Sequence, residues 1–272
     1  MAEAPTQPSF DRAAFNDRLR TQRLGRTLLV RAATESTNDD AWDAALAGAP
    51  DGTVVVADDQ TRGRGRDGRM WHQAPGRGLA LSVLLHAGCD HAGLTTAPLV
   101  AGLALVRALD TFRVETELKW PNDVLVRGRK LAGILCESRR DADGEDVVVM
   151  GVGVNVLQSR DEFPDALRDA ATSIALEGGA ATREAVAAEL LATLERVWDE
   201  HQEGDASAAL DAWRARAKIW GERLTVRTPA GEVSGIAIAL APDGGLMLRT
   251  DTGTELKIVT GDVVPAGAAA TT

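Results

Sequence analysis

Cysteine, positive charge and long apolar segments are all scarce in this sequence. Its 272 residues include two cysteines, Cys89 and Cys136, too few for a disulfide framework, so we expect a protein of the reducing cytoplasm. No apolar run approaches the roughly 18 residues that a transmembrane helix needs. The first ten residues are polar and acidic and lack the apolar core of a secretory signal. We therefore expect a globular protein without a membrane partner.

The net charge argues against another class of partners. Lys and Arg together number 30 against 40 Asp and Glu, a difference of −10. This balance argues against binding to the phosphate backbone of DNA or RNA. Only four of the 30 basic residues are lysines, so a single arginine carries little information in this chain and a lysine carries more. Two of the lysines, Lys119 and Lys130, lie close together in the sequence.

Hydrophobic periodicity predicts an α+β fold with a mixed, largely antiparallel sheet backed by helices, followed by a small β domain. Strands are expected over 28–30, 53–57, 79–85, 124–126, 131–137 and 147–154, and helices over 9–19, within 35–50, and over 96–112, 182–198 and 210–217. Four short strands at 223–228, 233–239, 245–250 and 254–260 predict a small barrel or sandwich. The expected parts are a tail with a short helix over 1–25, a large domain over 26–219, the β domain over 220–265 and a tail over 266–272.

Three small polar residues, Ser36, Thr37 and Asn38, begin the second predicted helix. Thr37 or Asn38 is expected to cap it. The helix residues expected to face the core are Trp42, Ala45 and Leu46. Short hydrogen-bonding side chains at a helix start also make a polar pocket floor, so capping and ligand binding both remain possible for these three residues.

The segment 61–71, TRGRGRDGRMW, is the most informative part of the sequence. Gly63, Gly65 and Gly68 match a dinucleotide-binding pattern, but the proline and glycines in 75–78 prevent the helix that this pattern requires. The segment carries four arginines against one aspartate. We predict a mobile loop of about twenty residues that binds phosphate or carboxylate. A solvated surface loop is the alternative interpretation.

A second group of polar residues surrounds an expected hairpin. Asn122 and Asp123 fall in a turn beside Lys119. Lys130 starts a strand whose next six residues are apolar or Gly, either as an edge lysine that reaches solvent or as a charge placed for function. Asn155 ends a buried strand, where it is either a turn residue or a ligand contact.

Histidine and cysteine form no recognisable catalytic or metal site. His86, Cys89 and His91 lie close in the sequence, but no fourth ligand is near, and a tight hairpin turn fits the segment better. His72 and His201 have no nucleophile partner in the sequence, so a Ser-His-Asp hydrolase has no support.

Taken in order, these segments resemble biotin–protein ligases, also called biotin–[acetyl-CoA-carboxylase] ligases. The motifs that carry the resemblance are ESTN, QTRGRGRDGRMW, KWPNDVLV, KLAGIL and GVGVNV, and it extends over about residues 30–265. The chain resembles the monofunctional type, which lacks a DNA-binding domain. The resemblance implies a class II synthetase-like ligase core and a small C-terminal SH3-like β domain that helps to engage ATP or the acceptor protein.

The resemblance also implies a reaction. MgATP activates biotin to biotinyl-5′-AMP, and biotin is then transferred to a lysine of a biotin carboxyl carrier domain of an acyl-CoA carboxylase. Residues 26–219 are then the domain that binds biotin and ATP. A lipoate– or octanoate–protein ligase and, from a different class, an Arg-Gly nucleic-acid-binding module are the alternatives.

Site residues carry over by motif from the resemblance, which implies catalytic roles for Lys130 and Arg66. The residues implied for biotin are Ser36, Thr37, Asn38, Gln60, Arg64, Gly65, Arg66 and Lys130. Those implied for ATP are Arg64, Arg66, Trp71, Lys119, Asn122, Asp123 and Asn155, with Asp123 also implied as a ligand of Mg²⁺.

The sequence departs from the family pattern in two places. Only about 30 residues precede the ligase-like region, so we expect no repressor activity, in agreement with the net charge of −10. Asp67 and Met70 stand where members often have basic residues, which lowers the local charge available to ATP. The oligomeric state, monomer or weak dimer, stays open.

Overall fold

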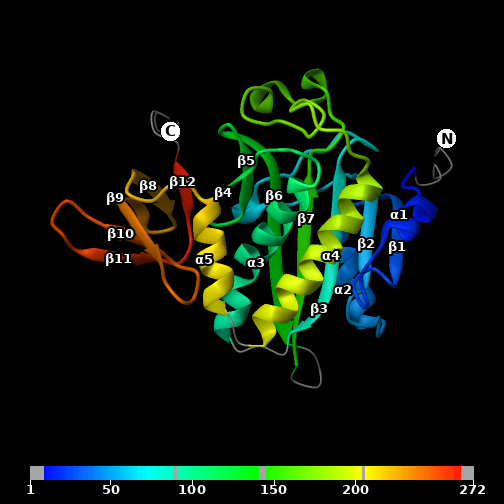
Figure 1. The fold of residues 1–272 in the computed structure, drawn as a ribbon, viewed down its shortest axis with the longest axis horizontal. Helices are drawn as coiled ribbons and strands as arrows, with labels where there is room; N and C mark the ends of the chain where they lie inside the picture. Colours follow the sequence, from blue (N-terminus) through cyan, green and yellow to red (C-terminus); the bar gives the residue numbers. More distant parts are fainter. Residues whose placement is uncertain (1–8, 88–90, 141–144, 204–205, 265–272) are drawn as a thin grey trace.

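The computed structural model describes residues 9–87, 91–140, 145–203 and 206–264, and has two β-sheets with helices packed on the larger one (Figure 1). Cys89 lies outside the described residues. The larger sheet has seven strands in the order β1-β2-β3-β7-β6-β5-β4. β1 and β2 run parallel, and the other neighbouring strands pair antiparallel. The predicted α+β class is therefore confirmed.

The elements have the following bounds. The larger sheet consists of β1 (Leu28–Thr34), β2 (Val54–Gln60), β3 (Leu79–Ala87), β4 (Glu117–Lys119), β5 (Asp123–Val126), β6 (Arg129–Arg140) and β7 (Asp146–Val154). The helices are α1 (Arg12–Arg18), α2 (Thr37–Leu46), α3 (His91–Asp110), α4 (Arg183–Gln202) and α5 (Ala206–Arg216). The smaller sheet consists of β8 (Arg223–Thr228), β9 (Gly231–Leu240), β10 (Leu246–Arg249), β11 (Glu255–Ile258) and β12 (Asp262–Val264).

Side chains alternate between the two faces of the larger sheet. Helices α3 and α4 cover one face (Figure 1), where Leu81 of β3 and Met150 of β7 are fully buried. Helix α2 packs on the opposite face, against Leu84 of β3 and Val149 of β7. Because helices cover both faces, the central strands read as nearly continuous apolar runs in the sequence. Beyond the start of α2, the second face carries small residues and is covered by loops, and this is where the cavity described below lies.

The start of α2 and one of its expected core residues differ from the prediction. The N-cap residue is Ser36, and Thr37 and Asn38 belong to the first helical turn, where their side chains turn toward the sheet. Leu46, expected in the core, is 84% exposed. The sheet contacts this helix along Ala41, Trp42 and Ala45, and Leu46 lies just outside that buried face.

Two further predictions concern single elements. The hairpin turn expected within 86–91 falls on residues 88–90, which lie outside the described residues, and the element that follows β3 is helix α3. β4 and β12 were not predicted, since strands of three residues carry too little periodicity to be seen in a sequence. Among the described helices, none combines the length and the apolar character that a bilayer span requires.

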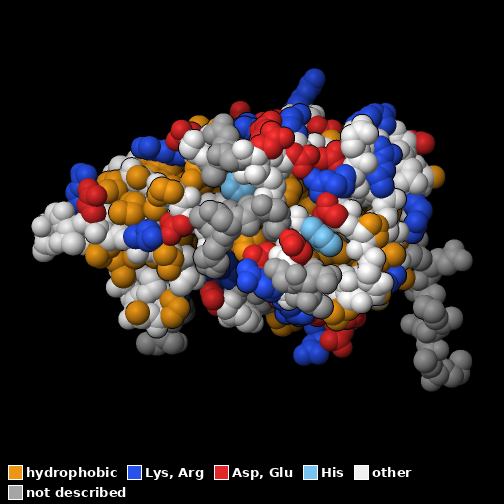
Figure 2. Space-filling view, turned by 90° about the horizontal axis from the view of Figure 1, so that it is seen from below, with side chains coloured by type: hydrophobic (Ala, Val, Ile, Leu, Met, Phe, Trp, Pro, Cys, Tyr) orange, Lys and Arg blue, Asp and Glu red, His pale blue; other side chains and the backbone are white. Residues whose placement is uncertain are grey.

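The smaller sheet has the order β11-β10-β9-β8-β12 and packs beside the larger domain (Figure 1), and it forms the left end of the molecule in the space-filling view of Figure 2. The turn between β9 and β10 attaches it. Trp120 is buried, and its Nε1–H donates to the Gly244 carbonyl at 2.9 Å. The Thr95 hydroxyl donates to the Asp243 carbonyl at 3.0 Å. β12 is the edge strand next to β8, at the opposite edge from β11, and its residue Asp262 lines the cavity described below.

A buried ion pair joins β2 to the start of α4. Arg183 and Asp58 are 4% and 7% exposed, and Arg183 Nη1 lies 2.6 Å from Asp58 Oδ1. The Ser9 hydroxyl accepts a second bond from Arg183 at 2.9 Å. Removing one partner of a buried pair leaves an uncompensated charge and is strongly destabilising.

We predict that Arg183→Met lowers the free energy of unfolding by about 3 kcal/mol, because Asp58 then stays buried without its cation. The matched control is Arg216→Met, which breaks the more exposed pair with Asp110 and should cost under about 1 kcal/mol. Urea unfolding of the two variants measures the difference. Equal losses would contradict the assignment of Arg183 as a structural cation.

Candidate active site

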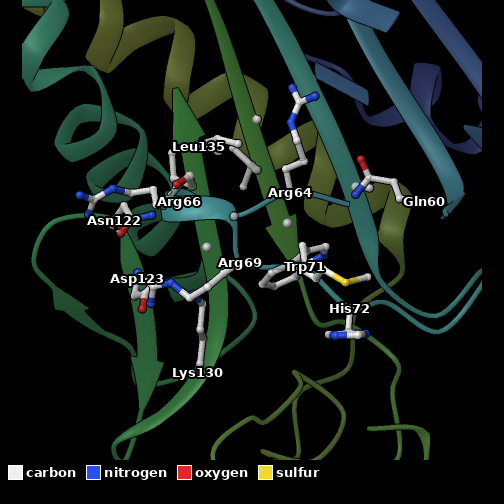
Figure 3. A pocket seen from close by; sticks show the side chains of 18 of the residues that line it. Gln60, Arg64, Arg66, Arg69, Trp71, His72, Asn122, Asp123, Lys130 and Leu135 are labelled. Atoms are coloured by element: carbon white, nitrogen blue, oxygen red, sulfur yellow. Dashed lines mark hydrogen bonds and ion pairs between the residues drawn. The ribbon is translucent and has the colours of Figure 1, made fainter. Parts of the chain in front are cut away.

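A cavity of about 300 Å³ opens on the sheet face beside the start of α2 (Figure 3). This volume suits a small-molecule ligand. The predicted site residues that line it are Ser36, Thr37, Asn38, Gln60, Arg64, Gly65, Arg66, Trp71, Asn122, Asp123, Lys130 and Asn155. Of the predicted set, Lys119 alone does not line the cavity. The structure therefore brings together residues from five separate sequence segments.

One end of the cavity is a network of neutral polar side chains. Gln60 Oε1 accepts from the Thr37 N–H at 2.8 Å and from the Thr37 hydroxyl at 3.1 Å. The Ser82 hydroxyl oxygen lies 2.7 Å from Thr37 Oγ1 and 2.6 Å from Asn38 Oδ1. Asn38 Nδ2 donates to the Leu135 carbonyl at 3.3 Å. These bonds orient the side chains in advance, as the recognition of an uncharged polar group requires.

The segment 63–71 is a hairpin, not the irregular loop that its glycines predict. The Trp71 N–H donates to the Gly63 carbonyl at 2.8 Å, and the Gly65 N–H donates to the Arg69 carbonyl at 2.7 Å. The tip is a 3-10 turn over Arg66–Gly68. A Cβ at Gly63 would lie 2.7 Å from the Trp71 carbonyl oxygen, so the two arms approach because this residue is glycine. The glycines therefore permit a close pairing of the arms.

Arg64 ties this hairpin to the neighbouring elements. Its guanidinium points away from the centre of the cavity (Figure 3). It donates to both carboxylate oxygens of Asp39 at 2.7 Å and to Glu137 at 3.1 Å. Asp39 belongs to α2 and Glu137 to β6. The stem of the hairpin is thus fixed on both sides of the cavity.

The tip of the hairpin contacts the smaller sheet. Arg66 Nη2 donates to the Thr260 hydroxyl at 3.0 Å, and its Nη1 to the Gly261 carbonyl at 3.3 Å. Arg69 forms an ion pair with Asp262 of β12. The hairpin therefore spans from α2 to the smaller sheet and closes one side of the cavity.

Lys130 lies at the cationic end, beside an aromatic wall. Its Nζ is 2.6 Å from Asp123 Oδ1 and 5.9 Å from the centre of the Trp71 ring. The side chain lies over Gly133, where an added Cβ would be 3.1 Å from Lys130 Cε. The Lys130 N–H donates to the Ala170 carbonyl at 2.8 Å. Of the two interpretations left open by the sequence, the geometry favours a charge held in the cavity wall.

Positive charge accumulates around Lys130. Burial lowers the pKa of the nearby Lys119; the positive charges of Lys130 and Arg69 lower it further, whereas Asp123 and Asp262 raise it. Asp123 pairs with Lys130 and Asp262 pairs with Arg69, but these two carboxylates are outnumbered by the three cations, so an excess of positive charge remains. This end of the cavity is therefore built for an anion such as a phosphate or carboxylate.

Asn155 lines the cavity, but its side chain is engaged with the protein. Its Nδ2 donates to the Thr172 carbonyl at 3.0 Å, and its Oδ1 accepts from Gln158 Nε2 at 3.0 Å. The Thr172 N–H in turn donates to the Lys130 carbonyl at 2.9 Å. Asn155 thus helps to hold the backbone beside Lys130.

Three glycines that the sequence analysis did not select form the floor of the cavity. Gly133 of β6 pairs with Gly153 of β7, and Gly151 lies two residues before it on the same face. A Cβ at Gly151 would overlap the Asn38 amide, and one at Gly153 would lie 2.7 Å from Trp71 Cζ2. The sequence signal for this floor is the two-residue spacing of Gly151 and Gly153 within an otherwise apolar strand. Such spacing indicates that other side chains, here those of Asn38 and Trp71, pack directly on the sheet.

We predict that Gly153→Ala displaces the Trp71 indole from the sheet, because the added methyl group occupies its position. The emission of Trp71 is obtained as a difference: the spectrum of the variant that carries both Gly153→Ala and Trp71→Phe is subtracted from that of Gly153→Ala. The emission maximum of Trp71 should shift to longer wavelength as the ring meets water. Gly151→Ala is the matched control, since its methyl group meets Asn38 instead. A Trp71 spectrum that is unchanged in Gly153→Ala would contradict this packing.

Comparisons with known proteins identify relatives of this chain. The chain matches the Biotin/lipoate A/B protein ligase family over residues 30–155 and the Biotin protein ligase C terminal domain over residues 219–264. It is 38% identical to a biotin–[acetyl-CoA-carboxylase] ligase of Mycobacterium tuberculosis, over 95% of this chain and 96% of that protein. It is 34% identical to a bifunctional ligase/repressor of Bacillus spizizenii, over 90% of this chain and 76% of that protein.

A solved structure is similar in fold as well as in sequence. The biotin protein ligase from Aquifex aeolicus, in complex with biotin and ATP, superimposes with a TM-score of 0.75 at 28% identity, covering 88% of this chain and 98% of that one. The chain belongs to the biotin protein ligase family, whose members are ATP-dependent ligases. The resemblance seen in the sequence motifs is confirmed, and so is the implied ligase core with a C-terminal β domain.

Proposed function

We propose that this ligase activates biotin with MgATP and transfers it to a lysine of a biotin carboxyl carrier domain of an acyl-CoA carboxylase. The name of the Mycobacterium tuberculosis relative supports this acceptor. The observation that carries the proposal is the position of Lys130, which lies in the wall of a cavity that also holds a neutral polar network. Biotin has a polar ureido head and a carboxylate at the end of an apolar chain, and the cavity offers partners for both.

We assign the ureido head to the neutral end. Asn38, Thr37 and Gln60 supply amide and hydroxyl groups there, with Ser36 at the cap of the same helix. Arg64 and Gly65 contribute through the hairpin backbone that covers the vitamin, because the Arg64 guanidinium is bound to carboxylates. The carboxylate of biotin then extends past Trp71 toward Lys130.

We assign ATP to the cationic end. Arg66 and Lys130 face the α-phosphate, and Lys119 and Asn122 support the rest of the triphosphate. Among the described residues, no group of three or more His, Cys, Asp or Glu side chains could hold a resident metal. Mg²⁺ commonly binds through one or two carboxylates and the phosphates of the substrate, so it enters as part of MgATP with Asp123 as its protein ligand. Trp71 and Asn155 complete the wall on the nucleotide side.

The reaction has two steps. A carboxylate oxygen of biotin forms a bond to the α-phosphorus of ATP, and the bond from that phosphorus to the pyrophosphate oxygen breaks. The ε-amine of the acceptor lysine then attacks the acyl carbon, loses a proton and expels AMP. Lys130 and Arg66 offset the repulsion between the two anions in the first step and stabilise the charge at phosphorus. The hairpin 63–71 excludes water from the activated intermediate.

We also propose a division of the chain. Residues 26–219 bind biotin and ATP, residues 220–265 form the β domain that supports the cationic end, residues 1–25 are a tail and the short helix α1, which packs on the first of these domains, and residues 266–272 are a second tail. Phe15 of α1 is fully buried and the helix packs on α4, so α1 belongs to the ligase core rather than to a DNA-binding unit. Together with the net charge of −10, this supports a ligase without repressor activity.

Pyrophosphate exchange into ATP, measured with biotin, lipoate and octanoate in parallel, tests the proposed substrate. We expect exchange with biotin alone, followed by labelling of a carrier domain and not of a carrier whose acceptor lysine is replaced by Arg. Faster exchange with lipoate or octanoate would contradict the assignment of biotin, and exchange without carrier labelling would contradict the proposed acceptor.

We predict that Lys130→Ala lowers the rate of biotin-dependent exchange by at least about 100-fold, since removal of one preorganised donor at a reacting anion costs 10²–10³ in rate. The matched control is Lys218→Ala, which removes a lysine that is 82% exposed and pairs with Glu117 away from the cavity. Near-normal exchange in Lys130→Ala would exclude the proposed role.

We predict that Arg66→Gly releases biotinyl-5′-AMP into solution, because the hairpin loses its contacts to Thr260 and Gly261 while the polar network stays intact. Chromatography of the filtrate measures the released adenylate. Arg62→Gly is the matched control. Arg62 precedes the hairpin, and its side chain is 75% exposed and pairs with Glu35. Release equal to that of the unmodified protein would contradict the covering role of Arg66.

A further inference from the structure

Glu137 contacts both the neutral polar network and the hairpin 63–71, but it is not among the residues proposed to contact biotin or ATP. It lies in β6, with its side chain on the cavity face of the sheet, opposite Val149 of β7. Its Oε2 accepts from Asn38 Nδ2 at 2.8 Å. The same oxygen accepts from Arg64 Nη2 at 3.1 Å. One carboxylate thus joins the neutral polar network to the hairpin 63–71.

On the side of the polar network, Glu137 fixes the direction of the Asn38 amide. The Ser82 hydroxyl lies against Asn38 Oδ1 at 2.6 Å, and the Glu137 carboxylate lies against Asn38 Nδ2. An ionised carboxylate only accepts, so a flipped amide would place its oxygen against another oxygen. Glu137 therefore helps to fix the orientation of the group proposed to face the ureido head, together with the Leu135 carbonyl, which accepts from the same Nδ2 at the longer distance of 3.3 Å.

On the side of the hairpin, Glu137 shares Arg64 with Asp39. Burial alone would lower the pKa of Arg64, but its hydrogen bond to the Asp39 carboxylate and the charge of Glu137 outweigh burial and raise the pKa. Among the hydrogen bonds of the described residues, none joins the side chains of Asp39 and Asn38, whereas the Glu137 side chain bonds to both Asn38 and Arg64. Glu137 is therefore a direct side-chain link between the polar network and the hairpin.

We propose that Glu137 is a positioning residue of the ligase, which orients Asn38 for the vitamin and anchors the covering hairpin with the same carboxylate. The inference rests on the proposed roles of Asn38 and the hairpin. Replacement by Gln tests it sharply, because Gln offers one acceptor oxygen and an NH₂ group, while both neighbours present donors. The one oxygen of glutamine could still accept from both neighbours, as Oε2 does here, but glutamine lacks the negative charge, and its NH₂ group would lie against Arg64 Nη2, from which Glu137 Oε1 accepts at 3.3 Å.

The experiment compares three variants with two readouts. Glu137→Gln affects both contacts, Ser82→Ala affects the Asn38 side only, and Asp39→Asn affects the Arg64 side only. The readouts are the Kd for biotin from calorimetry and amide hydrogen exchange of residues 36–38 and 63–71. Glu137→Asp, which keeps the charge but shortens the reach, carries the same test if Glu137→Gln does not fold.

Glu137→Gln should weaken biotin binding and speed exchange in 63–71, each by at least about tenfold, as expected for a lost hydrogen bond to a charged group. Ser82→Ala should weaken biotin binding without changing exchange in 63–71. Asp39→Asn should speed that exchange and change the Kd for biotin by less than about threefold, well below the tenfold effect of a lost charged hydrogen bond.

A Glu137→Gln variant that matches either control in both readouts would overturn the inference, as would one that equals the unmodified protein. A failure of the unmodified protein to bind biotin would contradict the proposed function instead. In that case exchange in 36–38 and 63–71 still decides the role of Glu137, because faster exchange in both segments supports it and faster exchange in one segment alone contradicts it.

Discussion

The account depends on one constraint: two anions must meet in a space that contains little water. Two unit charges of the same sign repel by about 1 kcal/mol at 4 Å in water and by about 4 kcal/mol where the effective dielectric constant is near 20. Positive groups must therefore be in place before the reactants arrive. The role proposed for Lys130 meets this requirement because hydrogen bonds to the segment 170–172 fix its backbone, Gly133 leaves room for its side chain, and Asp123 pairs with its ammonium group.

The hairpin 63–71 connects this cationic end to the rest of the molecule. Its stem is attached to α2 and β6 through Arg64, and its tip to the smaller sheet through Arg66 and Arg69. The smaller sheet is itself attached through Trp120, which lies directly before the turn that carries Asn122. The smaller sheet and the hairpin that forms one wall of the cavity are consequently joined by a few polar contacts.

Much of this arrangement is predictable from the sequence where the residue type is unusual for its surroundings. Lys130 stands out as a charge before an apolar strand, and Trp71 as an aromatic residue after an arginine-rich segment. Periodicity also predicts the long strands and helices, because each has enough residues to show its pattern. The cavity brings these segments together as the family motifs imply.

Other features depend on contacts that no local pattern encodes. Glu137 and Ser82 are ordinary residues for a strand, and their roles follow only from the register between β6, β7 and β3. The ion pair between Arg69 and Asp262 joins residues far apart in the chain. The spacing of Leu46 from Trp42 fits the apolar face of a helix, but the sheet packs on the part of α2 that carries Ala41 and Trp42 and leaves Leu46 in solvent.

The most direct test of the central claim is a crystal structure of the protein with biotin and a non-cleavable ATP analogue. We predict that Lys130 Nζ leaves Asp123 and lies within hydrogen-bonding distance of both the biotin carboxylate and the α-phosphate, with the ureido head against Asn38. A structure in which both ligands are bound while Lys130 still pairs with Asp123, away from either anion, would contradict the account.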